Sequence, residues 1–243
     1  RRGADAYRAY RCFQCHGGAA SELDAPDLTE AGQRLGRAWM AEWIADPAKF
    51  RAVPHMPRLV TPGESELIAD YLAAAGGEKP DGSSGDASAG EKLFAALQCA
   101  KCHGEEDQKI TLQKVGQKFR PGAVRDFLLN PQAHYRWIAM PNFKLSETEA
   151  VNLAAFIGEG AAAPEGTGEI EKGRELFETT GCLNCHAGPG RNRYEAKPIM
   201  NLSGGCLAEE TGKAPRYHFT AETREALAAY LKGETRIAEA EFA

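Results

Sequence analysis

The chain has 243 residues, of which 43% are hydrophobic and 26% charged, and its net charge is -5. This composition is typical of a globular protein, and no apolar run reaches the roughly 18 residues that a membrane-spanning helix requires. The net negative charge argues against nucleic acid as a partner, because phosphate binding needs a basic surface.

The first notable feature along the chain is a pentapeptide that recurs twice more and contains six of the seven cysteines. The three copies are Cys12-Phe-Gln-Cys15-His16, Cys99-Ala-Lys-Cys102-His103 and Cys182-Leu-Asn-Cys185-His186. C-x-x-C-H is the spacing of covalent haem attachment, in which both thiols bond to the haem and the histidine ligates its iron. A zinc site or a dithiol redox site also uses C-x-x-C, but neither explains a histidine directly after every copy. We therefore predict three covalently bound c-type haems.

A helix is predicted before each copy of the pentapeptide. A glycine stands nine residues before the first cysteine of each copy, and an aromatic residue follows that glycine by four positions. Residues four apart share one face of a helix. The glycine therefore allows another helix to approach closely, beside the aromatic ring. The three pairs are Gly3 with Tyr7, Gly90 with Phe94 and Gly173 with Phe177.

Matching loops and middle helices follow the first two copies. The loops read Leu-x-x-x-Gly-Gln, at 28–33 and 112–117. Compact helices are predicted over 37–46 and 123–130, each stopped by the proline that comes next. The third segment has no counterpart of this middle helix.

Each segment ends in a further predicted helix. Met56-Pro57 precedes a capping box at Thr61, and Met140-Pro141 precedes another at Ser146. In the third segment Ala214-Pro215 leads through Thr220 into the last helix. These helices close with an aromatic residue and an aliphatic one, namely Tyr71-Leu72, Phe156-Ile157 and Tyr230-Leu231.

Gly-rich stretches at 76–90 and 158–168 are predicted to be linkers. The predicted domains are therefore 1–76, 87–160 and a shortened 168–237. Domains of this size have marginal protein cores, and a buried haem would supply the missing apolar interior.

These residues resemble the class I cytochrome c family, repeated three times. The resemblance implies an all-α fold of three tandem domains, each wrapped around a haem, with the first and last helices crossing near it. It also implies that His16, His103 and His186 ligate iron, with Met56 and Met140 as sixth ligands. Pro26 would then lie in the loop against His16. His55 is an alternative to Met56, and His134 is expected at the surface or beside a haem propionate.

The third segment departs from this pattern, because Ala214 occupies the position of the methionine and cannot ligate iron. The strongest candidate for that ligand is Cys206, whose thiol would be a liability if free in an oxidising compartment. His218, Lys213 and Met200 are alternatives, and the iron could also stay open. A thiolate ligand would hold this haem at a lower potential than the two with methionine.

The predicted function is single-electron transfer in the periplasm or another extracytoplasmic space. The chain would act as a shuttle between a donor and an acceptor, or as a subunit of a larger, membrane-bound oxidoreductase complex. The alternative is an enzyme in which the haem without methionine oxidises sulfur compounds, as in thiosulfate dehydrogenases. An open iron would suggest peroxidase-like work instead, and a structural role as a wire within an assembly is a further possibility.

Overall fold

The computed structural model describes residues 1–16, 25–51, 54–77, 82, 84–104, 111–133, 138–158, 166, 168–196, 199, 204–208 and 214–241. Regular structure in these ranges is helical, with two isolated β-bridges and no strand. The predicted all-α fold is therefore confirmed. Among the described helices, none has the length and apolar character needed to cross a membrane.

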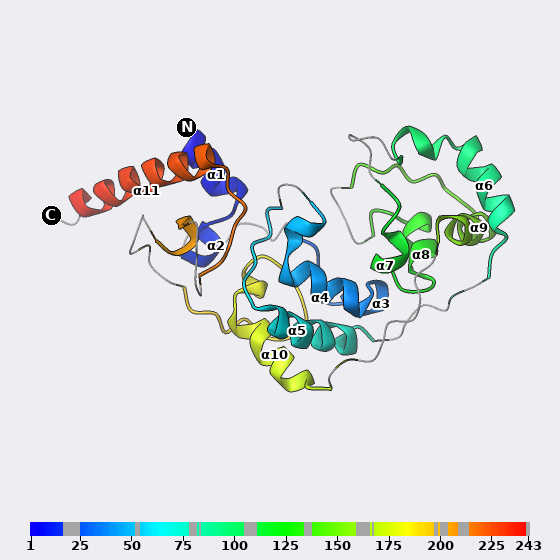
Figure 1. The fold of residues 1–243 in the computed structure, drawn as a ribbon, viewed down its shortest axis with the longest axis horizontal. Helices are drawn as coiled ribbons and strands as arrows, with labels where there is room; N and C mark the ends of the chain where they lie inside the picture. Colours follow the sequence, from blue (N-terminus) through cyan, green and yellow to red (C-terminus); the bar gives the residue numbers. More distant parts are fainter. Residues whose placement is uncertain are drawn as a thin grey trace.

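The helices gather into three lobes that lie in a row (Figure 1). The terminal lobe holds both ends of the described chain, in α1 (Arg2–Ala9), α2 (Phe13–His16), η4 (Gly205–Leu207) and α11 (Ala221–Glu241). The central lobe comprises α3 (Ala31–Arg34), α4 (Arg37–Ala45), η1 (Pro47–Lys49), α5 (Pro62–Ala75), α10 (Ile170–Thr179) and η3 (Cys182–Asn184). The inserted lobe comprises α6 (Ala87–Ala96), η2 (Cys99–Lys101), α7 (Val115–Lys118), α8 (Ala123–Leu129) and α9 (Glu147–Ile157).

Local sequence explains where most of these helices begin and end. Thr61 and Ser146 form the predicted capping boxes, in which each hydroxyl accepts from a backbone N–H three residues on and the glutamate there accepts in return. The helix α4 ends directly before Asp46 and Pro47, as predicted. The last helix continues past the predicted end at Leu231, because the residues that follow are mostly strong helix formers.

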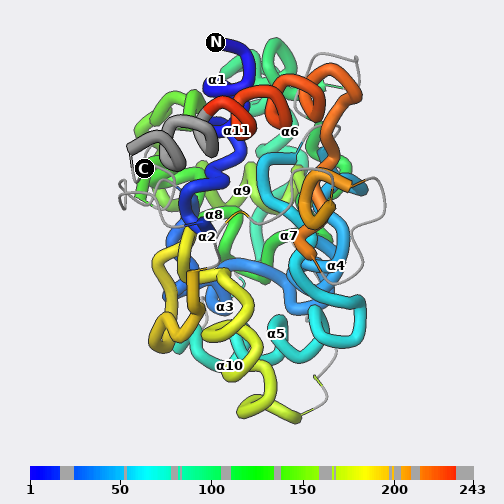
Figure 2. The backbone as a smooth tube through the Cα atoms, turned by 90° about the vertical axis from the view of Figure 1, so that its left-hand side faces the viewer, coloured from blue at the N-terminus to red at the C-terminus, as the bar shows by residue number. Residues whose placement is uncertain are grey.

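The pairing of first and last helices differs from the prediction in two of three cases. The inserted lobe pairs α6 with α9, both within the predicted domain 87–160. In contrast, α1 packs on α11, and α10 packs on α5. Figure 2 shows both pairs, with α11 across α1 and α10 beside α5. The segments 1–76 and 168–237 therefore interleave rather than fold separately.

A short antiparallel contact joins the central and inserted lobes through the two matching loops. Leu35 forms a β-bridge with Phe119. The backbone N–H of Gly36 donates to Lys118 at 2.8 Å, and that of Arg120 donates to Arg34 at 2.9 Å. One buried apolar cluster runs through both lobes, from Ile68, Leu72 and Phe177 to Val124, Leu128 and Leu153.

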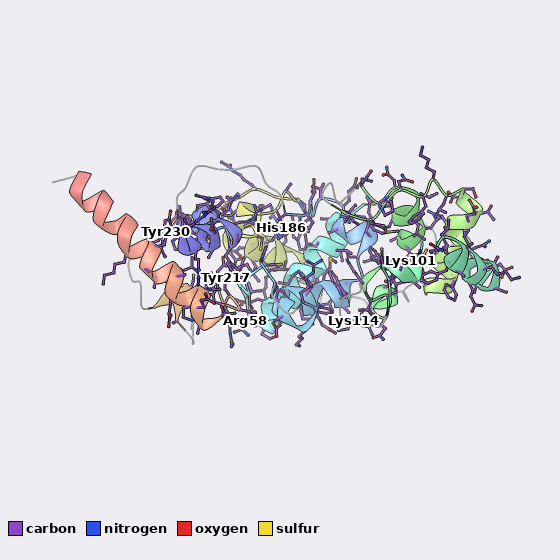
Figure 3. The ribbon with its side chains drawn as sticks, turned by 90° about the horizontal axis from the view of Figure 1, so that it is seen from above. Arg58, Lys101, Lys114, His186, Tyr217 and Tyr230 are labelled. Atoms are coloured by element: carbon purple, nitrogen blue, oxygen red, sulfur yellow. The ribbon has the colours of Figure 1, made fainter. Side chains whose placement is uncertain are left out.

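The terminal and central lobes are joined by a second bridge, between Arg58 and Arg216. Each residue donates its backbone N–H to the other's carbonyl at 2.9 Å. Figure 3 shows the resulting row, with Tyr217 and Tyr230 toward one end, His186 near the middle and Lys101 toward the other end. Along this row each lobe contains one copy of C-x-x-C-H.

Candidate haem attachment sites

The three pentapeptides adopt the same tight turn. In each copy the backbone N–H of the histidine donates to the carbonyl of the first cysteine, at 3.2 Å for His16, 2.9 Å for His103 and 3.0 Å for His186. The turn places both cysteines and the histidine at the end of the helix that precedes them. All seven cysteines are free of disulfides, so six thiols remain available for thioether bonds.

The thiols of the first and third copies lie in partly apolar surroundings. Burial, with the nearby Cys206 adding to it, raises the pKa of Cys12 to about 12. Burial and then the nearby Cys15 raise the pKa of Cys185 to about 11.

The imidazole of His186 is oriented by the loop after the first copy. Its Nδ1 donates to the carbonyl oxygen of Pro26 at 2.8 Å, which leaves Nε2 for a metal. Burial lowers the pKa of His186, and the neutral ring is the form that ligates iron. The backbone N–H of Leu28 also donates to Ala187 at 2.8 Å. The prediction that Pro26 lies against His16 is therefore wrong, because this loop packs on the third copy.

The two predicted methionine ligands lie on half-buried loops before α5 and α9. The indole Nε1 of Trp43 donates to the Sδ of Met56 at 3.1 Å. Trp43 also stacks on Trp39, with ring centroids 5.3 Å apart. Met140 packs against the shared apolar cluster of the central and inserted lobes. Each methionine is thus held beside the core of a lobe that contains a C-x-x-C-H copy.

Cys206 was expected at the third haem, but the structure brings it to the first pentapeptide. Burial and then the nearby Cys15 raise the pKa of Cys206, and Cys206 in turn contributes to the raised pKa of Cys12.

His218 lies beside the central lobe, with its Nε2 3.5 Å from Oδ1 of Asp46. His55 is exposed, and its ring packs against Tyr10 with centroids 5.4 Å apart. His134, Met200 and Lys213 lie outside the described residues.

Polar groups near the lobe boundary fit the carboxylates of a haem. The indole Nε1 of Trp39 is buried and has no hydrogen-bond partner among the described residues. Burial, and then the charges of Arg51 and Arg34, lower the pKa of Lys118 to about 8, while its Nζ lies 5.3 Å from the centroid of the Trp39 ring. A haem propionate accepts hydrogen bonds and would be a suitable partner for the buried indole N–H of Trp39.

These groups were not among the predicted site residues, although the two matching loops contain a signal for them. Arg34 follows Gly32-Gln33, and Lys118 follows Gly116-Gln117, so both loops place a basic residue at the same position. A cation that recurs at one place in two haem-binding units is a candidate partner for a propionate.

Comparisons with known proteins match the inserted lobe to one family model and part of the chain to curated relatives. The family model described as "Cytochrome C oxidase, cbb3-type, subunit III" matches residues 85–157. The cbb3-type cytochrome c oxidase subunit CcoP of Helicobacter pylori strain ATCC 700392 / 26695 is 26% identical over 113 residues, covering 44% of this chain and 39% of that protein. The CcoP of strain 52 is also 26% identical, covering 44% of this chain and 38% of its own length.

The chain thus spans less than half the length of the curated relatives it matches. No solved structure gives a significant match. The matching domain contains Cys99, Cys102 and His103 in their attachment turn, and it implies covalently bound haem c. Residues 85–157 therefore form a domain of the c-type cytochrome family.

Proposed function

We propose that the chain carries three covalently bound haem c groups and transfers single electrons between redox partners outside the cytoplasm. The observation that carries this proposal is the threefold recurrence of one arrangement. Each C-x-x-C-H turn follows a helix whose glycine and aromatic residue cross a second helix, at Tyr7 and Tyr230, at Phe94 and Phe156, and at Phe177 and Tyr71. A dithiol or zinc site would not require this second helix.

Met56 and Met140 are the proposed sixth ligands in two of the sites. Haem iron held by histidine and methionine changes oxidation state with little change in its coordination, which suits rapid electron transfer. Neighbouring residues of the chain hold the sulfur atoms of these two methionines in place. The hydrogen bond from Trp43 to Met56 limits the movement of that sulfur, and Met140 is held by the apolar cluster around it.

The first and third attachment turns lie close enough for direct electron exchange between their haems. The side-chain amide of Asn184 donates to the Sγ of Cys15 at 3.7 Å. Asn184 lies inside the third pentapeptide, so the two turns are in contact. Haems bonded to adjoining turns would be near neighbours, and short separations favour fast hopping.

The proposed partners are redox proteins of a membrane-bound oxidoreductase complex. The curated relatives are subunits of cbb3-type cytochrome c oxidases by name. We place this chain in the periplasm or an equivalent compartment, where it would be a subunit of such a complex or a carrier that docks on it.

A second candidate is a haem enzyme that oxidises sulfur compounds at the site without methionine. The specific observation in its favour is the position of Cys206 beside the thiols of Cys12 and Cys15. A thiolate ligand at that haem would resemble the one used by thiosulfate dehydrogenases. Steady-state turnover with thiosulfate and an electron acceptor, lost in Cys206→Ala, would favour this candidate over electron transfer alone.

The proposal is tested by counting haems in protein produced with a haem maturation system. A pyridine haemochrome assay should give three haems per chain. A titration with the strong reductant dithionite should then show the uptake of three electrons. Fewer than three haems in fully matured protein would contradict the proposal.

The sixth ligand of the remaining haem is tested by electron paramagnetic resonance of the oxidised protein. A thiolate ligand gives a low-spin ferric signal with a narrow spread of g-values, and the signal should disappear in Cys206→Ala. Its absence from the unmodified protein would leave His218, Lys213 or Met200 as the ligand, or an open iron.

A further inference from the structure

The contact between first and last helices has one geometry in all three lobes. A Cβ added to Gly90 would overlap the carbonyl oxygen of Asn152 and lie 2.9 Å from the Cβ of Phe156. The backbones of α6 and α9 therefore touch at this glycine. Phe94, one turn further along α6, packs against Phe156 with ring centroids 5.3 Å apart.

The same contact is repeated between α10 and α5, which lie about 100 residues apart in the chain. A Cβ on Gly173 would overlap the carbonyl oxygen of Leu67 and lie 3.0 Å from the Cβ of Tyr71. Phe177 packs against Tyr71 with centroids 5.7 Å apart. Leu67 precedes Tyr71 by four residues, as Asn152 precedes Phe156, so the register of the two contacts is identical.

The pair α1 and α11 completes the series. A Cβ on Gly3 would overlap the carbonyl oxygen of Ala226 and lie 2.5 Å from the Cβ of Tyr230. Tyr7 packs against Tyr230 with centroids 5.5 Å apart. Arg2 also forms an ion pair with Glu222 across this contact. The register again matches, with Ala226 four residues before Tyr230.

The loops on either side of the attachment turns follow the same exchange. The loop of the first segment reaches the third pentapeptide, through Pro26 to His186 and Leu28 to Ala187. A Cβ on Gly188 would lie 3.4 Å from the Cβ of Leu28. The loop around Leu28 therefore lies directly beside the residues that follow His186. The loop against His186 and the helix that packs on α10 therefore both come from the first segment, at residues 26–28 and in α5.

The first pentapeptide is surrounded by the end of the chain in a corresponding way. Tyr10 packs edge-on against Tyr217 and Phe219, with centroids 5.8 and 4.8 Å away. Burial, and then the nearby Cys12, raise the pKa of Tyr217. Arg224 of α11 donates to the carbonyl oxygen of Ala208 at 2.8 Å and so ties η4, with Cys206, to the last helix.

We propose that the first and third segments exchange the halves of their haem sites. The haem on Cys182, Cys185 and His186 takes Met56 as its sixth ligand, and the haem on Cys12, Cys15 and His16 is the one without methionine. This inference rests on the proposed binding of three haems. It reverses the assignment that the order of the sequence suggests, in which Met56 and His16 ligate the same haem iron.

The exchange also sets the order of the haems in space. The lobes lie as terminal, central and inserted (Figure 1), so the haem of the third pentapeptide lies between the other two. Both haems with methionine are then neighbours, and the haem without methionine is at the end of the row beside α11. Electrons entering at that end would reach the inserted lobe through the central haem.

The test removes one attachment site at a time from the full chain. Cys182→Ala with Cys185→Ala removes the third haem, Cys12→Ala with Cys15→Ala removes the first, and Cys99→Ala with Cys102→Ala is the matched control. A pyridine haemochrome assay counts the remaining haems. The charge-transfer absorption of ferric iron bound to methionine, calibrated per haem, counts how many of them keep that ligand.

The exchange predicts opposite results for the first two variants. Loss of the third haem should reduce the methionine-bound haems from two to one, and loss of the first haem should leave two. The control should also fall to one. The reverse result for the first two variants would overturn the exchange while leaving three haems in the unmodified chain. A count below three in the unmodified chain would instead contradict the proposed function.

A second measurement decides the matter even if the variants fail to mature. Sites for a specific protease are inserted at 78–83 and at 159–165 in the complete, haem-loaded protein, which carries an affinity tag at its first residue. After both cuts, residues 168–243 should remain with residues 1–77 in high salt, because α1 with α11 and α10 with α5 hold them together. Separation of the two fragments would overturn the exchange.

Discussion

The inserted and central lobes contain the same helix–helix contact, but the two helices come from one continuous stretch of chain in the first and from two distant stretches in the second. In the inserted lobe Gly90 and Asn152 belong to one stretch of chain, whereas in the central lobe Gly173 and Leu67 come from two distant stretches. Since the register is identical, the contact itself does not specify which copy of a helix pairs with which. Partner choice must come from groups outside the glycine and aromatic positions.

The polar contacts made by these helices differ from lobe to lobe. The backbone N–H of Asp86, at the start of α6, donates to the side chain of Asn152 at 2.8 Å. Between α1 and α11 the polar contact is instead an ion pair of Arg2 with Glu222. In the central lobe, Asp70 of α5 is 3% exposed and pairs with Arg37 of α4 at 2.5 Å. These contacts differ in burial, so their contributions to stability should also differ.

The largest expected effect is the loss of the buried pair. Asp70→Asn should destabilise the mature protein by about 3 kcal/mol, because a buried Arg37 then lacks its closest anion. Glu66, which also contacts Arg37 at 2.6 Å but is half-exposed, offsets only part of the loss. Thermal unfolding followed by circular dichroism measures the change.

The inserted lobe offers a matched control for this substitution. Arg125 of α8 and Glu147 of α9 also link a middle helix to a last helix, at 3.4 Å, but the Glu147 side chain is 66% exposed. Glu147→Gln should cost less than about 1 kcal/mol, as is usual for exposed pairs. Equal losses in the two variants would mean that the Asp70 pair does not hold the central lobe together.

The next effect concerns the close approach of α10 to α5. Gly173→Ala should destabilise the protein by about 1–3 kcal/mol, because its Cβ overlaps backbone atoms of Leu67 and the helices must move apart. Gly63→Ala is the control, since a Cβ on Gly63 meets no atom within 4 Å. That substitution should be neutral or stabilising, because alanine favours the helix. Unfolding midpoints in denaturant compare the two, and a stable Gly173→Ala protein would argue that α10 does not rest on α5.

Much of the local structure could be predicted from sequence, because its causes lie within a few residues. The capping boxes at Thr61 and Ser146, the stop before Pro47 and the three attachment turns all follow from short-range chemistry. The glycine and aromatic pairs were also recognised correctly as contact positions. Each of these features depends on neighbours in the chain.

The pairing of segments could not be predicted in the same way. Gly3, Gly90 and Gly173 have the same spacing to their aromatic residues, so the pattern fits any of three partners equally well. The order of the chain then favours the nearest one, which is wrong for α1 and α10. Pro26 was placed at the wrong pentapeptide for this reason, since that assignment assumed that each segment folds on itself.

A smaller effect concerns the hydrogen bond to Met56. Trp43 stands four residues before Pro47, and Phe127 stands four residues before Pro131, so the inserted lobe has a ring without a donor at the same position. Trp43→Phe removes the bond from Nε1 to Sδ, worth about 1 kcal/mol. If Met56 ligates iron, added imidazole should displace it about fivefold more readily.

The charge-transfer absorption of methionine-bound ferric haem can follow a titration with imidazole. Two phases are expected, one for each methionine, and Trp43→Phe should shift the midpoint of one phase and leave the other unchanged. Combining Trp43→Phe with removal of the third attachment site should abolish the shifted phase, because Met56 would no longer have an iron to bind. A shifted phase that survives this combination would mean that the bond acts at another haem. An unshifted titration in Trp43→Phe would mean that Trp43 does not position Met56.

Small effects are also expected at the two capping boxes, which are alike in the central and inserted lobes. Hydrogen bonds from Thr61 lower the pKa of Glu64, and those from Ser146 lower the pKa of Glu149. Each glutamate therefore binds its proton less readily in the folded chain than in the unfolded one. Its contribution to stability is present above the ordinary pKa of glutamate and is lost as the pH falls through the lowered value.

Thr61→Ala and Ser146→Ala should each cost about 1 kcal/mol at neutral pH, and the difference from the unmodified protein should shrink as the pH falls below 4. Because each box lies within one turn of helix, the two losses should be equal even though one lobe is continuous and the other is interleaved. Unfolding in denaturant at several pH values measures both. A much larger loss for Thr61→Ala would show that the start of α5 also supports its contact with α10, and that local and long-range structure are coupled in the central lobe.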